Sequence, residues 1–267
     1  RGHLQNRHVA FVGVGASLNL IKGCARTGVS RISLFDFDTV EVANLGRTAY
    51  EMRDVGRPKV EAARDHLLQV NPFCEVRAHH GDFMAIEDDE LAALLEDVNV
   101  LVMGTDAQQV QLRGNRIGRE LGKSMVFPGF YRRADGGEIV VVTPETPCYR
   151  CQVLSRFEAR EQDPSGNADL RAEAGLIFDC DHLDSIVGKI VVALLLKDDV
   201  EEFGEFCRHL ATHSLIFSKH HPSFLLEGVD LFGDFYGQSP LAYAYQTLWL
   251  DPRSWRDPGC PICGGEH

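Results

Sequence analysis

The sequence predicts an α/β fold built on a doubly wound, mostly parallel sheet. Short apolar runs alternate with segments of helical spacing from residue 8 to residue 144. The apolar runs are nearly continuous, which is typical of strands that helices cover on both faces. The first run, "HVAFVGVG" (residues 8–15), ends in glycines where a strand would turn into a helix. Strands and helices in strict alternation indicate parallel pairing.

The elements follow one another along the chain with ordinary start and stop signals. The helical segment that begins at residue 17 stops at Gly28, and the next has Pro58 in its first turn and Pro72 beyond its end. The expected strands are residues 8–15, 31–38, 75–80, 99–106, 124–130, 137–144 and 245–251. The expected helices are residues 17–28, 57–71, 87–96, 107–122 and 185–197.

The composition of the sequence changes after Pro144, where the alternation of apolar runs and helical segments ends. Residues 155–182 are polar and have few apolar anchors, so we expect a long loop that crosses over the sheet. The helix at 185–197 contains "IVGKIVVALLL", which is more apolar than one core-facing stripe needs. It fits either a buried helix or a dimer face. Residues 198–244 give no clear pattern.

Composition and charge exclude several classes of function. The 267 residues are 44% hydrophobic and 25% charged, which are ordinary globular values. With 27 Lys and Arg against 39 Asp and Glu, the net charge of −12 argues against nucleic acid or an anionic membrane as the main partner. No uninterrupted apolar run reaches about 18 residues, so we expect no membrane span. We also expect no signal peptide.

Four of the eight cysteines have the spacing of a metal site. Cys148 and Cys151 form "CYRC", and Cys260 and Cys263 form "CPIC". Four thiolates would complete the tetrahedral coordination of Zn²⁺, so we expect a structural zinc clip that joins the chain end to the sheet. The alternatives are disulfides and a redox pair, which would need only one CxxC. An acidic chain without a signal peptide favours a reduced compartment, and hence the cytoplasm.

A polar segment, "DFDTVEVANLGRTAY" (residues 36–50), follows the second expected strand. It lies where doubly wound sheets bind ligands, and Asp36 can accept hydrogen bonds from ribose hydroxyls. The backbone amides of "GVGAS" (residues 13–17) can face a phosphate at a helix N-terminus. Leu18 stands where the dinucleotide fingerprint has its third glycine, which makes a nicotinamide cofactor the poorer fit. The alternative is a glycine-rich turn that binds nothing.

Two cations and a further carboxylate favour a triphosphate. Arg47 and Lys59 supply the forked donor and the point charge that a phosphate chain needs. Asp106 closes the fourth expected strand at the same edge, where a carboxylate beside a triphosphate can hold Mg²⁺. Taken singly, Arg47 and Lys59 would be solvated surface charges, and Asp106 would be a helix N-cap.

Together these segments resemble the ThiF/MoeB-type adenylyltransferases, a family that includes the ubiquitin-activating enzymes. The resemblance covers residues 8–197 and 245–264. It rests on seven blocks in order: "GVGAS", "SRISLFDFDTVEVANLGR", "VGRPKVEAARDHLLQVNP", "VLVMGTD", "GEIVVVTPETPCYRC", "EAG" (173–175) and "DPGCPICG". It implies one Rossmann-like domain over residues 1–267. Residues 1–144 would form its nucleotide-binding half, and residues 145–267 its crossover-loop, zinc-binding and partner-binding half.

The resemblance also implies a role for each site residue. Gly15 and Ala16, next to Gly13, would lie under the phosphates of ATP. The other expected roles are ribose binding by Asp36, lining of the site by Asp38, phosphate contacts by Asn44, Arg47 and Lys59, magnesium binding by Asp106, and zinc binding by Cys148, Cys151, Cys260 and Cys263.

The implied reaction is ATP-dependent adenylation of the C-terminal carboxylate of a ubiquitin-like or sulfur-carrier protein, usually one that ends in Gly-Gly. The carboxylate attacks the α-phosphate and pyrophosphate leaves. Arg47, Lys59 and Mg²⁺ on Asp106 would supply the positive field that this attack requires. A homodimer is implied. The alternatives are adenylation of a small peptide or tRNA-bound acyl group, and a non-catalytic, zinc-clipped scaffold that binds a ubiquitin-like partner.

Two of the chain's departures from the family pattern concern the residues after Asp106 and the cysteine that would form a thioester. After the aspartate the family often has Asn and, four residues on, Arg, where this chain has Ala107 and Gln111. Many relatives also pass the acyl group to a cysteine in the crossover loop. The nearest thiol here is Cys180, which His182 could activate to form a thioester. The alternative is a buried, inert cysteine at the start of the next helix.

Overall fold

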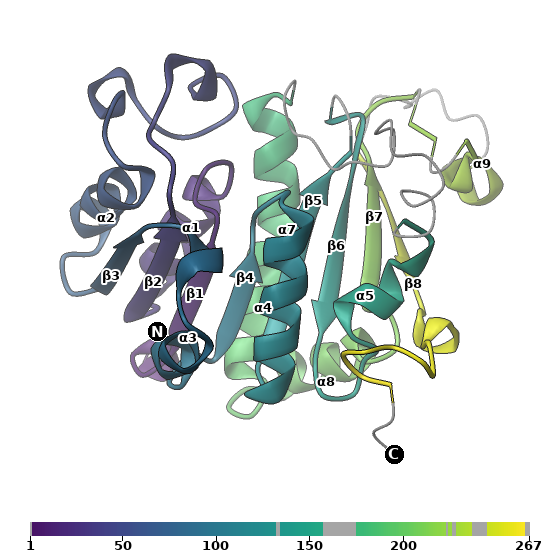
Figure 1. The fold of residues 1–267 in the computed structure, drawn as a ribbon. Helices are drawn as coiled ribbons and strands as arrows, with labels where there is room; N and C mark the ends of the chain where they lie inside the picture. The colour runs from purple at the N-terminus through teal and green to yellow at the C-terminus, as the bar shows by residue number, and fades with distance from the viewer. Residues whose placement is uncertain are drawn as a thin grey trace.

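Eight strands form one sheet with helices on both of its faces (Figure 1). A computed structural model gives the structure and describes residues 2–131, 134–156, 175–222, 224–225, 228–236 and 245–264. The strand order is β3-β2-β1-β4-β5-β6-β7-β8. The pairs from β3 to β5 are parallel, and the pairs from β5 to β8 are antiparallel. The predicted doubly wound, mostly parallel fold is thereby confirmed: strands β1 to β5 form its parallel part, and β6 to β8 add an antiparallel extension.

The central strands are buried on both faces, as their apolar runs predict. Every residue of β1 and β4 is buried, whereas the edge strand β3 carries exposed polar residues. This difference follows from position, because only an edge strand of a doubly covered sheet meets water. The strands are β1 (His8–Val12), β2 (Arg31–Asp36), β3 (Glu75–His80), β4 (Val100–Met103), β5 (Ser124–Phe130), β6 (Gly136–Val142), β7 (Leu215–Lys219) and β8 (Gln246–Leu250).

The helices divide into two layers. In Figure 1, α4 lies in front of the sheet and α7 behind it. One core cluster is covered by α1, α2, α7 and α8, and the other by α3, α4 and α5. The helices are α1 (Leu18–Thr27), α2 (Lys59–Val70), α3 (Asp88–Leu95), α4 (Gln108–Glu120), α5 (Tyr149–Gln152), α7 (Ile177–Leu196), α8 (Glu201–Leu210) and α9 (Leu231–Tyr236). Short 3-10 turns are η1 (Gly2–Leu4), η2 (Val42–Asn44), η3 (Met52–Asp54), η4 (Phe83–Ala85) and η6 (Arg253–Trp255).

The structure corrects the predicted crossover loop at its end. Residues 177–182 belong to α7, which begins eight residues before the predicted helix at 185–197. The polar start of α7 has no apolar stripe to reveal it, but Asp179 Oδ2 accepts a hydrogen bond from the Leu176 N–H at 3.0 Å and caps the first turn. Residues 157–174, which hold most of the predicted loop, lie outside the described residues.

The structure places two further segments that the sequence left undecided. The apolar part of α7 packs between the sheet and α1 and α8, which accords with the buried-helix interpretation. Within residues 198–244, the structure adds α8, β7 and α9, and β7 pairs with both β6 and β8 in the main sheet. None of the helices in the described ranges is both long and apolar enough to span a membrane.

Candidate active site and cysteine cluster

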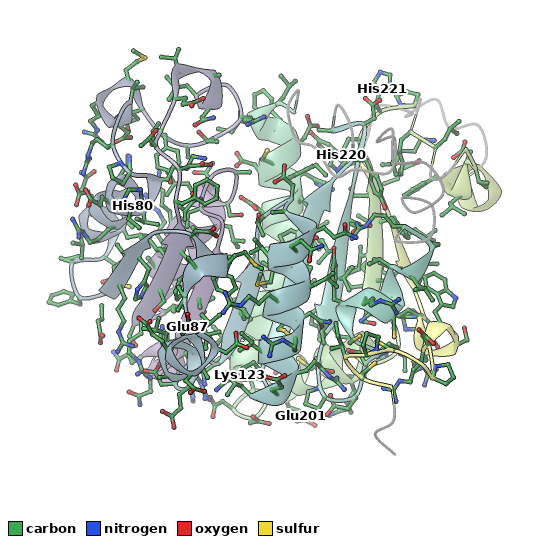
Figure 2. The ribbon with its side chains drawn as sticks, viewed as in Figure 1. His80, Glu87, Lys123, Glu201, His220 and His221 are labelled. Carbon is green, nitrogen blue, oxygen red and sulfur yellow. The ribbon has the colours of Figure 1, made fainter. Side chains whose placement is uncertain are left out.

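A cavity of about 280 Å³ lies at the carboxyl edge of the parallel strands, between the loops that follow β1, β2 and β4. Figure 2 labels His80, which ends β3 at this edge, and Lys123, which precedes β5 at the opposite edge. The nine nucleotide-site residues predicted from the sequence all line this one cavity: Gly13, Gly15, Ala16, Asp36, Asp38, Asn44, Arg47, Lys59 and Asp106.

Close contact between two glycines forms the floor of the cavity. Gly13 follows β1 with φ +84°, a conformation that favours glycine, and its N–H donates to the Phe35 carbonyl at 2.8 Å. A Cβ on Gly13 would lie 2.5 Å from the carbonyl oxygen of Gly104, which follows β4. A Cβ on Gly104 would in turn lie 2.8 Å from Ser17 Oγ. A side chain at Gly13 would therefore push the two loops apart, whereas one at Gly104 would first displace the Ser17 hydroxyl.

Asp36 ties the end of β2 to the turn after β1. Its Oδ2 accepts a hydrogen bond from the Val14 N–H at 2.9 Å, and its Oδ1 accepts one from the Asp38 N–H at 2.8 Å. Burial raises the pKa of the Asp36 carboxyl, and these two hydrogen bonds offset part of the rise. Both oxygens keep lone pairs that can accept from hydroxyl groups of a ligand.

The segment between β2 and α2 places Lys59 inside the cavity. The Lys59 N–H donates to the Asp38 carbonyl at 2.9 Å, and Lys59 Nζ lies 2.7 Å from Asp38 Oδ2. Tyr50 braces the segment, because its hydroxyl lies 2.9 Å from the Val14 carbonyl and 3.1 Å from the Lys59 carbonyl. The side chain of Lys59 is almost fully buried, so its position is fixed before any ligand arrives.

Asn44 and Arg47 lie on the same segment, and Asp106 lies across the cavity from it. Asn44 is buried, and its Oδ1 accepts a hydrogen bond from the Glu41 N–H at 3.0 Å, which closes the turn η2. Arg47 lines the cavity three residues later. Asp106 is exposed to solvent at the rim, so a ligand or a metal ion can reach its carboxylate.

The charge of the lining differs from the positive field that the sequence predicted. Among the described residues of the cavity wall, two are cationic and five are acidic. The cations are Arg47 and Lys59, and the acids are Asp36, Asp38, Asp82, Asp106 and Asp184. Sequence reasoning missed Asp82 and Asp184, which come from the end of β3 and from α7 rather than from a recognised motif.

Asp184 is the unusual member of this set. It lies on α7, and it faces both the cavity and a second hollow of about 750 Å³ between α1 and α7. Its Oδ2 is buried and has no hydrogen-bond partner. Burial raises the pKa of Asp184 well above its usual value, and a hydrogen bond from the Leu20 N–H opposes the rise only in part.

Cys180 does not line this cavity. Its side chain is only 2% exposed, and it faces the core from the first turn of α7. Burial raises the pKa of the thiol to about 12, and the nearby carboxylates of Asp184, Asp179 and Asp181 add to the rise. A thiol that stays protonated and covered is a poor nucleophile, so the geometry favours the inert alternative. The predicted "EAG" block lies mostly outside the described residues.

The two CxxC pairs meet in one buried cluster. Cys148 immediately precedes α5 and Cys151 lies within it, whereas Cys260 and Cys263 follow β8. The four sulfurs lie within 4.8 Å of one another. Two facing pairs are separated by 3.7 and 3.6 Å, far more than the roughly 2.05 Å of a disulfide. Around a metal with sulfur ligands at about 2.3 Å, the tetrahedral edge is about 3.8 Å.

The surroundings of the cluster also fit a metal ion. The Arg150 guanidinium pairs with Asp257 Oδ2 at 3.1 Å and so links the two CxxC segments directly. A Cβ on Gly264 would lie 2.5 Å from backbone atoms of Cys260, so this turn can form only with glycine. A hydrogen bond from Cys151 lowers the pKa of the Cys148 thiol. Four buried sulfurs are the donor set of a closed zinc site.

The chain is similar in sequence to one protein family and to several known proteins. A model of the ThiF family matches residues 1–208. The molybdopterin-synthase adenylyltransferase of Escherichia coli K12 is 36% identical over 163 residues, which is 58% of this chain and 61% of that protein. The sulfur carrier protein adenylyltransferase of Thermus thermophilus is 27% identical over 270 residues, which is 98% of this chain and 84% of that protein.

Other relatives are similar over part of their length. The chain spans 42% of the ubiquitin-like modifier-activating enzyme 5 of Dictyostelium discoideum, to which it is 30% identical over 160 residues. Among solved structures, E. coli MccB with MccA-N7isoASN has a TM-score of 0.69 at 18% identity and covers 99% of this chain and 69% of that chain. MccB with ATP has a TM-score of 0.67 at 18% identity. This likeness shows the fold.

The Asp184 carboxyl predicts a pH-dependent gain in stability on substitution. In the unfolded chain the Asp184 carboxyl has its ordinary pKa of about 3.9, and in the folded chain its pKa is higher. Between these values the folded chain binds more protons, so ionisation of Asp184 lowers stability as pH rises. We expect Asp184→Asn to have a larger free energy of unfolding than the wild type at about pH 8 and a similar one at about pH 4.

Urea unfolding followed by circular dichroism at each pH measures this difference. Asp251→Asn is the contrasting control, because hydrogen bonds from Arg253 lower the pKa of Asp251 to about 2 and its loss brings no such gain. A difference between wild type and Asp184→Asn that is the same at both pH values would contradict the prediction.

Removal of one sulfur should break the metal site. We expect Cys260→Ser to lose bound zinc and to lower the free energy of unfolding by about 4 kcal/mol, since loss of a metal is among the largest single effects. Zinc content by mass spectrometry and urea unfolding measure the two effects. Cys207→Ser is the control, because this partly exposed thiol lies on α8 and outside the cluster. Wild-type protein without zinc would refute the assignment.

Proposed function

The chain belongs to the ThiF family, and on that premise we propose that it uses ATP to adenylate the C-terminal carboxylate of a ubiquitin-like or sulfur-carrier protein. The main support is that residues from the ends of β1, β2 and β4 converge on one cavity, although they are up to 93 positions apart in the chain, from Gly13 to Asp106. Relatives named as adenylyltransferases of such carriers give further support.

The nucleotide would lie across the loops after β1 and β2. The turn from Gly13 to Ala16 leads into α1, whose N-terminal N–H groups favour an anion. Lys59 Nζ lies 3.8 Å from where a Cβ on Gly15 would be, so the ammonium group faces the same backbone turn. The carboxylate of Asp36, fixed by two backbone N–H groups, can accept hydrogen bonds from ribose hydroxyls.

The acidic lining implies that the nucleotide binds with a divalent cation. Arg47 and Lys59 cannot neutralise both the carboxylates of the wall and a triphosphate. Lys59 already pairs with Asp38, so part of its positive charge is neutralised within the protein. Mg²⁺ on the exposed carboxylate of Asp106 would supply the missing positive charge and hold phosphate oxygens.

The chemical step then needs positioning more than proton transfer. The attacking C-terminal carboxylate is already ionised, so no general base is required. Arg47 and Lys59 hold the phosphate chain while the carboxylate oxygen bonds to the α-phosphorus and the bond to pyrophosphate breaks. The products are an acyl-adenylate and pyrophosphate. Zinc at the four cysteines would take no part in the chemical step, since four protein sulfurs leave no open position.

The partner and the assembly belong to the same proposal. The substrate tail would be a flexible C-terminus that ends in Gly-Gly and enters the cavity with its carboxylate first. The protein would act as a homodimer in the cytoplasm. Exchange of labelled pyrophosphate into ATP tests the activity. Exchange that depends on a Gly-Gly tail supports it, exchange with a free peptide alone redirects it to peptide adenylation, and no exchange leaves a zinc-clipped scaffold.

Lys59 should be essential for exchange. We expect Lys59→Ala to lower the rate of ATP–pyrophosphate exchange about 100-fold, a typical loss for one charged donor at a transition state. Lys123→Ala is the matched control, because Lys123 lies at the opposite edge of the sheet (Figure 2) and contacts the Glu96 carbonyl. Equal rates in the two variants would contradict the proposed phosphate site.

Cys180 tests whether a thioester follows adenylation. Because the thiol is buried and its pKa is raised to about 12, we expect Cys180→Ala to keep the exchange activity and any adduct with the carrier protein. Non-reducing electrophoresis, with and without thiol, detects such an adduct. An adduct that is sensitive to thiol in the wild type and absent in Cys180→Ala would restore Cys180 as the nucleophile.

A further inference from the structure

A buried amide connects the turn that carries Asp106 with the cysteine cluster. Gln111 lies on α4 and is 2% exposed. Its Nε2 donates to the Thr105 carbonyl at 2.7 Å, one residue before Asp106. Its Oε1 accepts a hydrogen bond from the Tyr149 hydroxyl at 2.7 Å. Both ends of the amide are therefore committed, one to the nucleotide cavity and one to α5.

Tyr149 lies between the first two cysteines of the cluster and is fully buried. Its ring stacks on Phe127 with a centroid distance of 4.2 Å and an interplanar angle of 15°. Its N–H donates to Asn115 Oδ1 at 3.1 Å, so α4 holds the backbone of Tyr149 through Asn115 and its hydroxyl through Gln111. The position of Tyr149 thus determines where the Gln111 amide can point.

The cluster, in turn, determines the position of Tyr149. Helix α5 has only four residues, and a helix that short has no stability of its own in water. Cys148 and Cys151 flank Tyr149, and each faces a cysteine 112 residues further along the chain. Without a metal ion, weak contacts between thiols would be all that joins these two segments at the sulfurs.

A charged pair completes the arrangement on the far side of Tyr149. The Arg156 guanidinium donates to the Tyr149 hydroxyl oxygen and also to the buried carboxylate of Glu138. Tyr131 donates its hydroxyl to Glu138 Oε2 at 2.5 Å. The Tyr149 hydroxyl therefore accepts a hydrogen bond from Arg156 and donates one to Gln111, so it acts as both acceptor and donor.

We propose that Gln111 and Tyr149 are positioning residues that couple metal loading of the cysteine cluster to binding of Mg·ATP. The proposal rests on the proposed nucleotide site. With metal bound, Tyr149 holds the Gln111 amide against the Thr105 carbonyl and so fixes the turn that presents Asp106. When the cluster loosens, the buried Gln111 oxygen loses its donor and the turn loses its brace. Thermodynamic linkage requires that Mg·ATP strengthen metal retention by the same factor.

Competition between the protein and a chelator for zinc at equilibrium, measured with and without Mg·ATP, tests this coupling without any reference to turnover. In wild-type protein we expect Mg·ATP to protect the zinc by raising its affinity about fivefold, the lower end of ordinary coupling between sites. Tyr149→Phe removes one hydroxyl and leaves all four sulfurs. We expect it to bind a full complement of zinc, to lose the protection by Mg·ATP, and to weaken Mg·ATP binding about fivefold in calorimetry.

Tyr131→Phe is the matched control, because it removes a buried hydroxyl at the other end of the same network and leaves Gln111 untouched. It should keep both the protection and the affinity for Mg·ATP. Gln111→Met, which keeps the length of the side chain without its polar atoms, should reproduce Tyr149→Phe if that variant fails to fold.

Four results would overturn either the coupling or the proposed function. Equal losses in Tyr149→Phe and Tyr131→Phe would reduce the effect to general stability and overturn the proposal. So would persistent protection in Tyr149→Phe or Gln111→Met. A wild-type protein that binds Mg·ATP but shows no protection would refute the coupling and leave the proposed function intact. A wild-type protein that retains zinc but does not bind Mg·ATP at all would refute the proposed function itself.

Discussion

The candidate site depends on how closely the backbones after β1 and β4 approach each other. A side chain at Gly13 would put its Cβ 2.5 Å from the Gly104 carbonyl oxygen, so this approach requires glycine at position 13. In the order β3-β2-β1-β4-β5, the chain turns to opposite sides of the sheet after β1 and β4, and a crevice opens between them. Asp106 follows Gly104 in the loop after β4, whereas Asp36 and Lys59 come from the neighbouring segment after β2, and all three line this crevice.

The electrostatics of the cavity determine how the proposed site could accommodate a polyanion. With five carboxylates and two cations on the wall, the site alone would repel a triphosphate. Two features reduce the repulsion: Asp184 has its pKa raised well above the usual value by burial, and Asp38 is paired with Lys59. The remaining acids suit a divalent cation, so cation and nucleotide would enter as one unit.

Local signals made the first half of the chain predictable. Glycines, buried runs and polar strand ends near residues 13, 36 and 106 lie within or directly after single strands, so their period and turn chemistry identify them. Asp184 could not be found in this way, because only the packing of α7 against α1 brings it to the cavity. The same is true of β7, whose five residues are buried by pairing with β6 and β8 rather than by any pattern of their own.

The cysteine cluster relates the antiparallel half of the sheet to the cavity. It joins segments 112 residues apart, and closing so long a loop removes much of the freedom of the unfolded chain. Arg156 is the last described residue before the connection to α7. Its guanidinium forms an ion pair with Glu138, and Glu138 on β6 lies opposite Gly129 on β5, which lines the cavity. The chain returns at Ile177, whose N–H donates to the Gly46 carbonyl beside Arg47. Arg156 and Ile177, which lie near the two ends of this connection, are thus both tied to segments that line the cavity, so the fold fixes where the connection leaves and rejoins the site.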